Sequence, residues 1–419
     1  MEATEKAVRD AMHQAGAALL SRLLSMPAPH RPMVPCACGG QARYHDTRSK
    51  SLLTVLGPVA IERPYYVCSQ CRDGQSPLDQ ELDVVGTECS PGVRRMMAVV
   101  GSNSSFDQGR EQLELLAGLQ VATKAVERQA EAMGADVEQQ EQAKIQRAVQ
   151  LELPEILGYA VPILYIEMDG VQVPVVRSEL SGRAGRLEGQ DPRTREVKLG
   201  CVFTQTTIDK EGRPIRDDDS TTYTGAIETA ERFGPRIYTE AWERGWSRAQ
   251  QKVVLGDGAD WIWNIAGQHF PGAIQIVDFY HAREHIWELA AKLFPAQPRQ
   301  RKHWANKMVA KLNRGHIESL VKALRSLPPP TPELGQQLRS EANYFQSNKE
   351  RMRYPAFKRQ HLFVGSGVIE AGCKTVVGSR LKQSGMFWTV RGANAIIALR
   401  CSRLSRKFED YWASRLRAA

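Results

Sequence analysis

Three short apolar segments in the middle of the chain each run into an aspartate, and this pattern constrains the fold more than any other feature. The segments have the length and apolar content of buried β-strands, and the aspartates that follow them are Asp169, Asp257 and Asp278. Helical patterns separate the later segments, so we expect an α/β domain with a mixed sheet. Carboxylates at the ends of core strands can converge in one cleft, where they repel unless a divalent cation neutralises them. The pattern therefore predicts a metal site.

Each aspartate also has a purely structural interpretation. Asp169-Gly170 is a dipeptide typical of a type I′ turn, which predicts that the preceding strand forms a hairpin with Val171–Val176. Asp257 can bend the chain, and Asp278 or Asp260 can cap a helix. Taken singly these interpretations are the simpler ones, whereas the acids together favour the metal site.

Four cysteines form two close pairs nearer the start of the chain: Cys36, Cys38, Cys68 and Cys71. The first helical segment, Glu2–Leu24, lacks the apolar block of a secretion signal, so the pairs indicate zinc rather than disulfides. Thiolates suit zinc, which takes four ligands tetrahedrally. The β-branched and aromatic residues around Gly57-Pro58 predict a hairpin between the pairs. We expect a small zinc-containing ribbon; four reduced core cysteines are the alternative, and the first pair is spaced more tightly than is usual.

A helical pattern follows the ribbon. Leu113–Leu116 and Val121–Met133 are separated by Ala117-Gly118, which predicts a helix-turn-helix whose second helix could enter a DNA major groove. Two packed helices with a glycine turn and no DNA contact are the alternative.

Charge is unevenly distributed along the 419 residues. Residues 1–282 contain 30 Lys and Arg against 38 Asp and Glu, whereas residues 283–419 contain 26 against 9. A segment this basic favours a polyanionic partner, because neutralising phosphates releases counterions; a basic, solvated helical surface is the alternative. No apolar run approaches the roughly 18 residues of a membrane span, so we expect a cytoplasmic protein without membrane contact.

The basic segment is mostly helical, from Arg283 to about Lys358, with a break at Pro328–Pro330. Its apolar stripe is most simply core. His281 and His285 are four residues apart and could bind a metal, but no third ligand motif lies nearby, so we expect a structural role for His285.

Further along, Gly365–Lys374 predicts a helix start. It places Glu370 in the first turns and Lys374 one turn later on the same face. Apolar neighbours indicate a largely buried helix, and an exposed salt-bridging pair is the alternative.

This succession resembles the bacterial DDE insertion-sequence transposases of the ISKra family, in the Mutator-like group. The resemblance rests on Asp169-Gly170 after a strand, Gly256–Trp261, Asp278–His281, a helical insertion and then Gly365–Glu370. It extends to the cysteine ribbon, to Ser105-Phe106 and to Met386–Trp388, and so spans nearly the whole chain. It implies a ribonuclease-H-like mixed sheet with flanking helices and an all-α insertion, preceded by a zinc-ribbon-like and helix-turn-helix region.

The resemblance also implies a reaction and its residues. Asp169, Asp257 and Glu370 would be the catalytic acids and hold two Mg²⁺ ions, or Mn²⁺, with Asp260 competing for the second position. Phosphodiester cleavage would free a 3′-OH at each transposon end, and that hydroxyl would attack target DNA. The supporting residues would be Asp278, His281, Asp260 and Lys374. The residues contacting DNA would be Lys374, Arg380, Lys382, Trp388 and Arg391, although a buried role is simpler for Trp388.

The partners implied are double-stranded DNA and further copies of the chain, acting on the bacterial nucleoid. The expected divisions are 1–35, an N-terminal helix; 36–89, the ribbon; 90–152, the helix-turn-helix region; 153–286, the first catalytic part; 287–360, the insertion; and 361–419, the Glu370 helix with basic C-terminal helices. Two other functions stay open: a ribonuclease-H-like nuclease or resolvase without strand transfer, and a non-catalytic zinc-containing DNA-binding protein.

Overall fold

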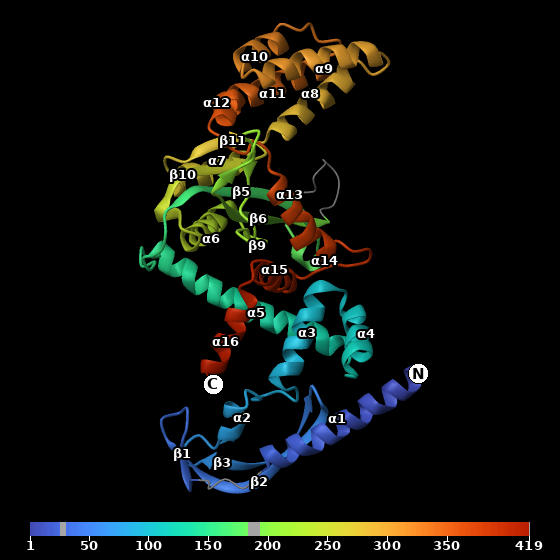
Figure 1. Ribbon diagram of the computed structural model, residues 1–419, viewed down its shortest axis with the longest axis vertical. Helices are drawn as coiled ribbons and strands as arrows, with labels where there is room; N and C mark the ends of the chain where they lie inside the picture. Colours follow the sequence, from blue (N-terminus) through green and yellow to red (C-terminus); the bar gives the residue numbers. More distant parts are fainter. Residues whose placement is uncertain (26–30, 183–192, 419) are drawn as a thin grey trace. The chain divides into compact units, whose positions relative to one another are not determined.

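The computed structural model describes residues 1–25, 31–182 and 193–418 (Figure 1). The chain forms two compact units, Met1–Asp136 with Lys407–Ala419, and Val137–Arg406. The division falls inside helix α5 (Thr123–Val149), and the C-terminal helix α16 (Phe408–Ala418) belongs to the first unit. The finer divisions expected from the sequence stay predictions. None of the helices in the described ranges is long and apolar enough to cross a membrane.

The first unit begins with helix α1 (Glu2–Leu24), which has the bounds expected from the sequence. It is followed by an antiparallel sheet in the order β1-β2-β3-β4 and by α2 (Pro77–Glu81). The strands are β1 (Met33–Pro35), β2 (Gln41–Thr54), β3 (Gly57–Cys68) and β4 (Gly74–Gln75). Strands β2 and β3 form the predicted hairpin, and Ala17 of α1 packs into an apolar cluster with Leu52 and Ile61 of these strands.

Three helices complete the main part of the first unit: α3 (Pro91–Asn103), α4 (Phe106–Ala117) and the start of α5. Ser90 and Ser105 accept main-chain N–H bonds at the starts of α3 and α4. Gly118 ends α4 with a φ of 68°, a left-handed conformation that glycine adopts at little cost. The predicted break at Ala117-Gly118 is therefore confirmed, whereas contact of these helices with DNA stays a prediction.

The second unit contains a five-stranded mixed sheet in the order β11-β10-β5-β6-β9. Strand β6 is antiparallel to both of its neighbours, β5 and β9, whereas β10 is parallel to β5 and to β11. The strands are β5 (Val161–Pro174), β6 (Thr194–Gln205), β9 (Thr222–Ala226), β10 (Ala249–Gly256) and β11 (Ile274–Val277). A separate pair is formed by β7 (Thr207–Ile208) and β8 (Pro214–Ile215).

The hairpin expected at Asp169-Gly170 is not formed. Strand β5 runs straight through both residues, which pair with Leu199 and Lys198 of β6. The sequence prediction was wrong because a dipeptide favours a turn only weakly, whereas β6 pairs with β5 from Ile163 to Pro174 and keeps it extended through both residues. Asp169 consequently has no turn role and belongs to the sheet.

Helices cover both faces of this sheet. A Cβ at Gly200 of β6 would lie 2.6 Å from Cδ1 of Ile237, so the glycine allows helix α6 (Ala230–Glu243) to pack closely. The neighbouring residue on β6, Leu199, contacts Gly372 at the end of α13 (Gly367–Gly372). Because successive side chains of a strand point to opposite faces, α6 and α13 lie on opposite faces of the sheet.

A helical insertion lies between β11 and α13 in the chain. Its helices are α8 (Phe279–Leu293), α9 (Pro298–Asn313), α10 (Ile317–Arg325), α11 (Pro332–Ser347) and α12 (Tyr354–Arg359), of which α9, α10 and α11 lie together in orange in Figure 1. The insertion and the proline break were predicted. After α13 the chain forms a π-helical turn at Cys373–Gly378, then α14 (Ser379–Leu381) and α15 (Val390–Leu404).

Candidate active site and metal centre

Asp169, Asp257 and Asp278 lie at one level across three neighbouring strands. Asp257 and Asp278 directly follow the ends of β10 and β11, whereas Asp169 lies inside β5, which continues past it, so the expected strand end at Asp169 was wrong. Leu255 of β10 pairs with Glu167 of β5, so Asp257 is level with Asp169, two residues further on each parallel strand. Gly256 pairs with Val277 of β11, which makes Asp278 level with Asp257. Helix α7 (Asp260–His269) begins just after this edge. Three adjacent strands thus bring the aspartates to the same level.

The aspartates also share a face of the sheet with Glu370. Asp169 lies directly opposite Leu199, the β6 residue that contacts α13, and directly paired residues have side chains on the same face. Asp278 is fully buried and accepts hydrogen bonds from the main-chain N–H and, at 2.6 Å, from the Oγ of Ser366, the residue before α13. Since Glu370 lies on α13, the fold brings the predicted first and third acids to one side of the sheet.

Glu370 is exposed on α13, and its Oε1 lies 3.3 Å from the Oγ of Ser366. The predicted helix start at Ser366 is confirmed as a position, but its hydroxyl does not cap α13 and donates to Asp278 instead. Asp278 also accepts the N–H of His281 at 2.7 Å, which caps α8. One buried carboxylate therefore ties the first turn of α8 to the start of the Glu370 helix.

The electrostatics of this edge reflect crowded negative charge. Burial raises the pKa of Asp169, and the charges of Asp257 and Glu370 raise it further, against hydrogen bonds from the Gly170 N–H and the Cys373 thiol that lower it. The Cys373 Sγ lies 3.4 Å from Asp169 Oδ2. Like charges at these positions are what a bound cation would neutralise.

A buried acid that the sequence analysis did not single out lies beside them. Glu167 has no exposed surface; its Oε2 accepts the Ile369 N–H at 2.9 Å, and its Oε1 has no hydrogen-bond partner. Burial raises its pKa to about 8, and the neighbouring charges of Asp278 and Glu370 contribute. The signal in the sequence was one charged residue within an otherwise apolar strand.

Asp257 and Asp260 occupy different environments. The Asp257 Oδ1 accepts the Ala259 N–H at 2.9 Å, and its main-chain carbonyl accepts the Tyr344 hydroxyl at 3.0 Å. Asp260 is the exposed first residue of α7, where its charge faces Arg351. Asp257 thus directly follows β10, level with Asp169. Asp260 is the first residue of α7 and does not cap it, because the N-cap residue is Ala259 and no side chain accepts a capping hydrogen bond there.

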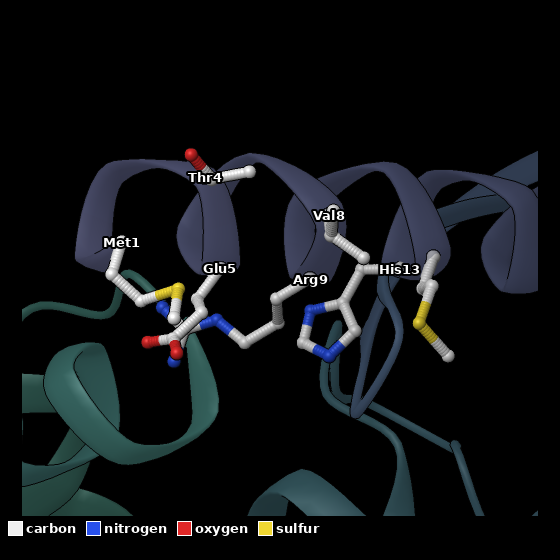
Figure 2. Close-up of a pocket in the computed structure, with 7 residues that line it drawn as sticks. Met1, Thr4, Glu5, Val8, Arg9 and His13 are labelled. Atoms are coloured by element: carbon white, nitrogen blue, oxygen red, sulfur yellow. The ribbon is translucent and has the colours of Figure 1, made fainter.

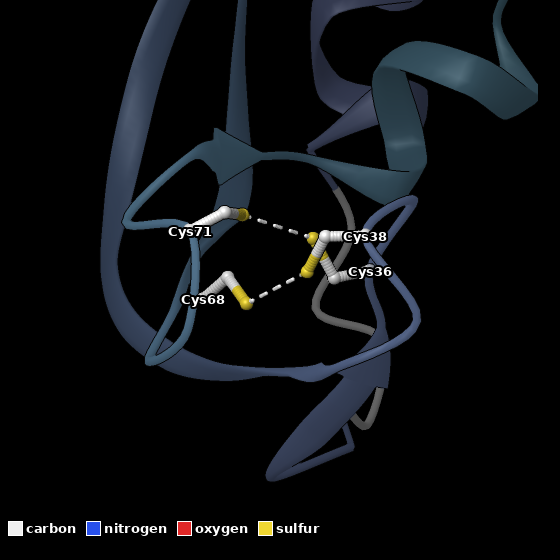
Figure 3. A group of neighbouring side chains, drawn as sticks. All are labelled: Cys36, Cys38, Cys68 and Cys71. Atoms are coloured by element: carbon white, nitrogen blue, oxygen red, sulfur yellow. Dashed lines mark hydrogen bonds between the residues drawn. The ribbon is translucent and has the colours of Figure 1, made fainter.

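The four cysteines of the ribbon lie together (Figure 3). In the described residues they form the one group of three or more potential metal ligands whose donor atoms all lie within 4.8 Å of one another. The Sγ atoms of Cys36 and Cys71 are 3.6 Å apart, as are those of Cys38 and Cys68. Two sulfurs at about 2.3 Å from a tetrahedral zinc lie about 3.8 Å apart, so this donor set fits zinc.

The thiols of this cluster do not titrate alike. Main-chain N–H groups of Cys71 and Gln70 lower the pKa of Cys68 to about 6. The Asp73 N–H favours the Cys71 thiolate, but desolvation and hydrogen bonds with the other three thiols outweigh it and raise the pKa of Cys71 to about 12. Zinc binds thiolates, so its binding must release protons from this cluster and weaken as pH falls.

The residues predicted to contact DNA divide into two sets. Lys374, Lys382 and Arg391 are exposed. Arg380 is fully buried and Trp388 is 6% exposed, and the guanidinium carbon of Arg380 lies 5.0 Å from the indole ring of Trp388. A buried cation packed on a buried ring cannot reach a phosphate in this structure, so only Lys374, Lys382 and Arg391 stay candidates for DNA contact.

The remaining predicted residues, His281 and His285, face each other on α8, with their Nε2 atoms 3.2 Å apart.

A separate hollow of about 420 Å³ lies along α1, and none of the predicted site residues lines it. Glu5, Arg9 and His13 point to the same side of the helix there (Figure 2). Arg9 Nη1 donates to the Leu115 carbonyl at 3.1 Å, which joins α1 to α4.

Comparisons with known proteins identify no family. No family model matches the chain, and no curated protein matches it. Among solved structures, the Drosophila P element transposase strand transfer complex matches with a TM-score of 0.25 and 9% sequence identity, over 77% of this chain and 83% of that chain. A TM-score this low establishes no common fold, so this likeness carries no part of the proposal that follows.

Proposed function

We propose that the chain is a metal-dependent DNA transposase of the DDE type, with a ribonuclease-H-like catalytic domain in its second unit. The observation that carries this proposal is the placement of Asp169 and Asp257 on adjacent parallel strands, at one edge and on the face that bears Glu370. The mixed sheet and the helical insertion before α13 support it. The resemblance drawn from the sequence motifs supplies the reaction.

In this proposal Asp169, Asp257 and Glu370 hold two Mg²⁺ or Mn²⁺ ions. Their carboxylate oxygens are the hard ligands that these cations prefer. Burial raises the pKa of Asp169, and the charges of Asp257 and Glu370 raise it further, a repulsion that a cation would relieve. When bound, the ions would stabilise the attacking and leaving oxygens of an in-line phosphodiester displacement. Asp278 acts as a positioning residue, because its hydrogen bonds with Ser366 set the start of the Glu370 helix.

The chain's own cations would hold the DNA backbone. Lys374 follows Glu370 by one helical turn, and Lys382 and Arg391 are exposed further along. Residues 283–419 contain 26 Lys and Arg against 9 Asp and Glu, which favours association with a polyanion. We include the zinc ribbon and helices α4 and α5 among the elements that bind transposon ends, and assembly of at least two copies on paired ends.

The test uses the full chain, Mg²⁺ and a plasmid that carries the DNA flanking its gene on both sides. We expect cleavage that leaves a 3′-OH, followed by joining of that end to a second DNA. Asp169→Asn and Glu370→Gln should each abolish both steps while DNA binding persists, because the amide keeps the shape and removes the charge. Cleavage without joining would indicate a nuclease or resolvase, and DNA binding without any nicking would indicate a non-catalytic protein.

A further inference from the structure

Two histidines at the start of α8 face each other through the same kind of ring nitrogen. His281 and His285 lie one turn apart, and their Nε2 atoms are 3.2 Å apart. Their ring planes are inclined at 83° with centroids 4.9 Å apart. The two Nε2 atoms are therefore close enough to share either a hydrogen or a metal ion.

Carboxylates face the other nitrogen of both rings. The His285 Nδ1 lies 2.8 Å from Glu341 Oε2 of α11, and the His281 Nδ1 lies 3.6 Å from Glu284 Oε2. An ionised carboxylate only accepts hydrogen bonds, so the Nδ1 of His285 carries the hydrogen, and the neutral ring has its lone pair on Nε2. Glu284 lies beyond hydrogen-bond distance of the His281 Nδ1, so it does not fix the tautomer of His281. In the metal-free chain the His281 Nε2–H can donate to the His285 Nε2 at 3.2 Å, and a bound metal ion would take the place of that hydrogen.

We infer that His281 and His285 bind a transition metal ion of the zinc class through their Nε2 atoms. Two nitrogens at about 2.0–2.1 Å from a tetrahedral zinc lie about 3.3–3.4 Å apart, close to the observed 3.2 Å. A carboxylate on the far nitrogen of a histidine is the usual outer partner of a metal-bound imidazole, and Glu341 has that position. Imidazole nitrogens suit zinc, whereas the carboxylates at the strand ends suit magnesium, so the two sites differ in the metal they select.

The surroundings hold this pair in place while leaving room for further ligands. The His285 ring stacks on Tyr344 with centroids 4.2 Å apart and planes within 11°, and the Tyr344 hydroxyl donates to the Asp257 carbonyl. The side chains of His281 and His285 are 39% and 27% exposed, so water can complete the coordination. Asp278 is not a third ligand, because its oxygens accept hydrogen bonds from Ser366 and the His281 N–H.

The experiment must separate this site from the cysteine cluster. The full-length chain is first loaded with one equivalent of Zn²⁺ and then titrated with ZnCl₂ by calorimetry in a buffer containing Mg²⁺. We expect one further zinc per chain, and we expect His281→Ala and His285→Ala each to lose it. Co²⁺ added to the preloaded chain should give visible d–d bands without the thiolate charge-transfer absorption of a cysteine site.

Two further variants make the result decisive. Glu341→Gln should weaken the second zinc by about 10–100-fold while the protein still folds, since outer carboxylates contribute that much to affinity. His303→Ala, at an exposed histidine of α9, should bind like the wild type. Wild-type protein that takes up no second zinc, or His281→Ala protein that binds it unchanged, would overturn the inference. Should His285→Ala fail to fold by circular dichroism, the His281→Ala and Glu341→Gln titrations decide alone.

Discussion

The cysteine cluster and the carboxylate edge, formed by Asp169, Asp257 and Glu370, are both candidate metal centres. Only in the cysteine cluster do all the donor atoms lie close to one another. The four sulfurs come from two turns of one small sheet and lie within 4.8 Å of one another. The acids come from strands and a helix spread over 200 residues, and among the described residues no three carboxylates approach in that way. Although the Asp73 N–H favours the Cys71 thiolate, desolvation and hydrogen bonds with the other thiols raise the pKa of Cys71 to about 12, so the thiol cluster does not carry a charge on every sulfur and can assemble before a metal arrives. Ionised carboxylates instead repel until a cation neutralises them. Short distances between donor atoms in the absence of an ion are therefore expected of a thiol site but not of a magnesium site.

The largest loss of stability should come from removing two of the four cysteine ligands. In Cys68→Ser/Cys71→Ser we expect loss of about one zinc per chain and unfolding of the β1–β4 sheet, since structural zinc contributes on the order of 10 kcal/mol. Metal analysis with circular dichroism measures both. Cys89→Ser, outside the cluster, should keep its zinc. A wild-type protein that is folded and free of zinc after expression in zinc-containing medium would contradict the site.

The next effect separates the two neighbouring acids of the carboxylate edge. Asp257→Asn should reduce DNA cleavage by on the order of 10³-fold, about 4 kcal/mol in the barrier, whereas Asp260→Asn should change it by less than about 3-fold. The reason is that Asp257 is level with Asp169, while Asp260 begins α7 in solvent. Initial cleavage rates at saturating Mg²⁺ measure the difference. The reverse order of effects would move the second catalytic position to Asp260.

The buried acid beside the edge should give the third effect. The pKa of Glu167 is about 8 in the native state and near 4.5 when the chain is unfolded, so the native state holds the extra proton between these values. Stability of the metal-free protein should therefore fall as pH rises from about 4.5 to 8. Glu167→Gln should remove that dependence and stabilise the protein by a few kcal/mol at pH 8.

Urea unfolding at pH 6 and pH 8 in buffer without divalent cations measures this change. The exposed Glu211→Gln provides the matched control and should keep the wild-type dependence. Parallel curves for Glu167→Gln and the wild type would show that Glu167 ionises normally.

The smallest effect concerns the cations beside the edge. Lys374→Ala or Arg391→Ala should each weaken DNA binding a few-fold and reduce the slope of log affinity against log salt concentration by about 1, as for one phosphate contact. Arg380→Met should instead lower the unfolding temperature without changing that slope, because Arg380 is buried against Trp388. Fluorescence anisotropy over a salt series measures the slopes. A reduced slope in Arg380→Met would place Arg380 on DNA.

Local signals in the sequence predicted much of this structure. The bounds of α1, the end of α4 at Gly118 and the clustering of the cysteines follow from the helical sequence pattern, the helix-ending glycine and ligand spacing. The predictions that failed or were missing depend on distant partners. Asp169-Gly170 extends because β6 pairs with it, β9 (Thr222–Ala226) carries no strong strand pattern of its own, and α16 joins the first unit through residues near the other end of the chain.

The candidate site shows the same limit. The positions of Asp257 and Asp278 after β10 and β11 could be predicted, because those strands end in a recognisable way, whereas β5 continues through Asp169. A buried role for Trp388 was the simpler interpretation and is observed, but the burial of Arg380 and Glu167 could not be predicted, since burial of a charged residue is decided by the elements that pack over it. The sequence shows which residues are basic or acidic, but only the tertiary contacts show which of them are exposed to solvent and which are buried.

Asp278 holds both ends of the helical insertion, because it caps α8 and accepts hydrogen bonds from Ser366. The length of the insertion is therefore not what sets the position of its two ends on the sheet. The 279–365 segment leaves and re-enters at one carboxylate, and the Phe279 N–H also donates to the Val364 carbonyl at 2.8 Å. Residues at the two ends of the insertion are therefore hydrogen-bonded to each other and to Asp278. We therefore expect insertions in the loops that join α9, α10 and α11 to leave the start of the Glu370 helix in place, whereas loss of α11 or α12 would remove the hydrogen bonds that Tyr344 and Tyr354 donate to the Asp257 and Val277 carbonyls.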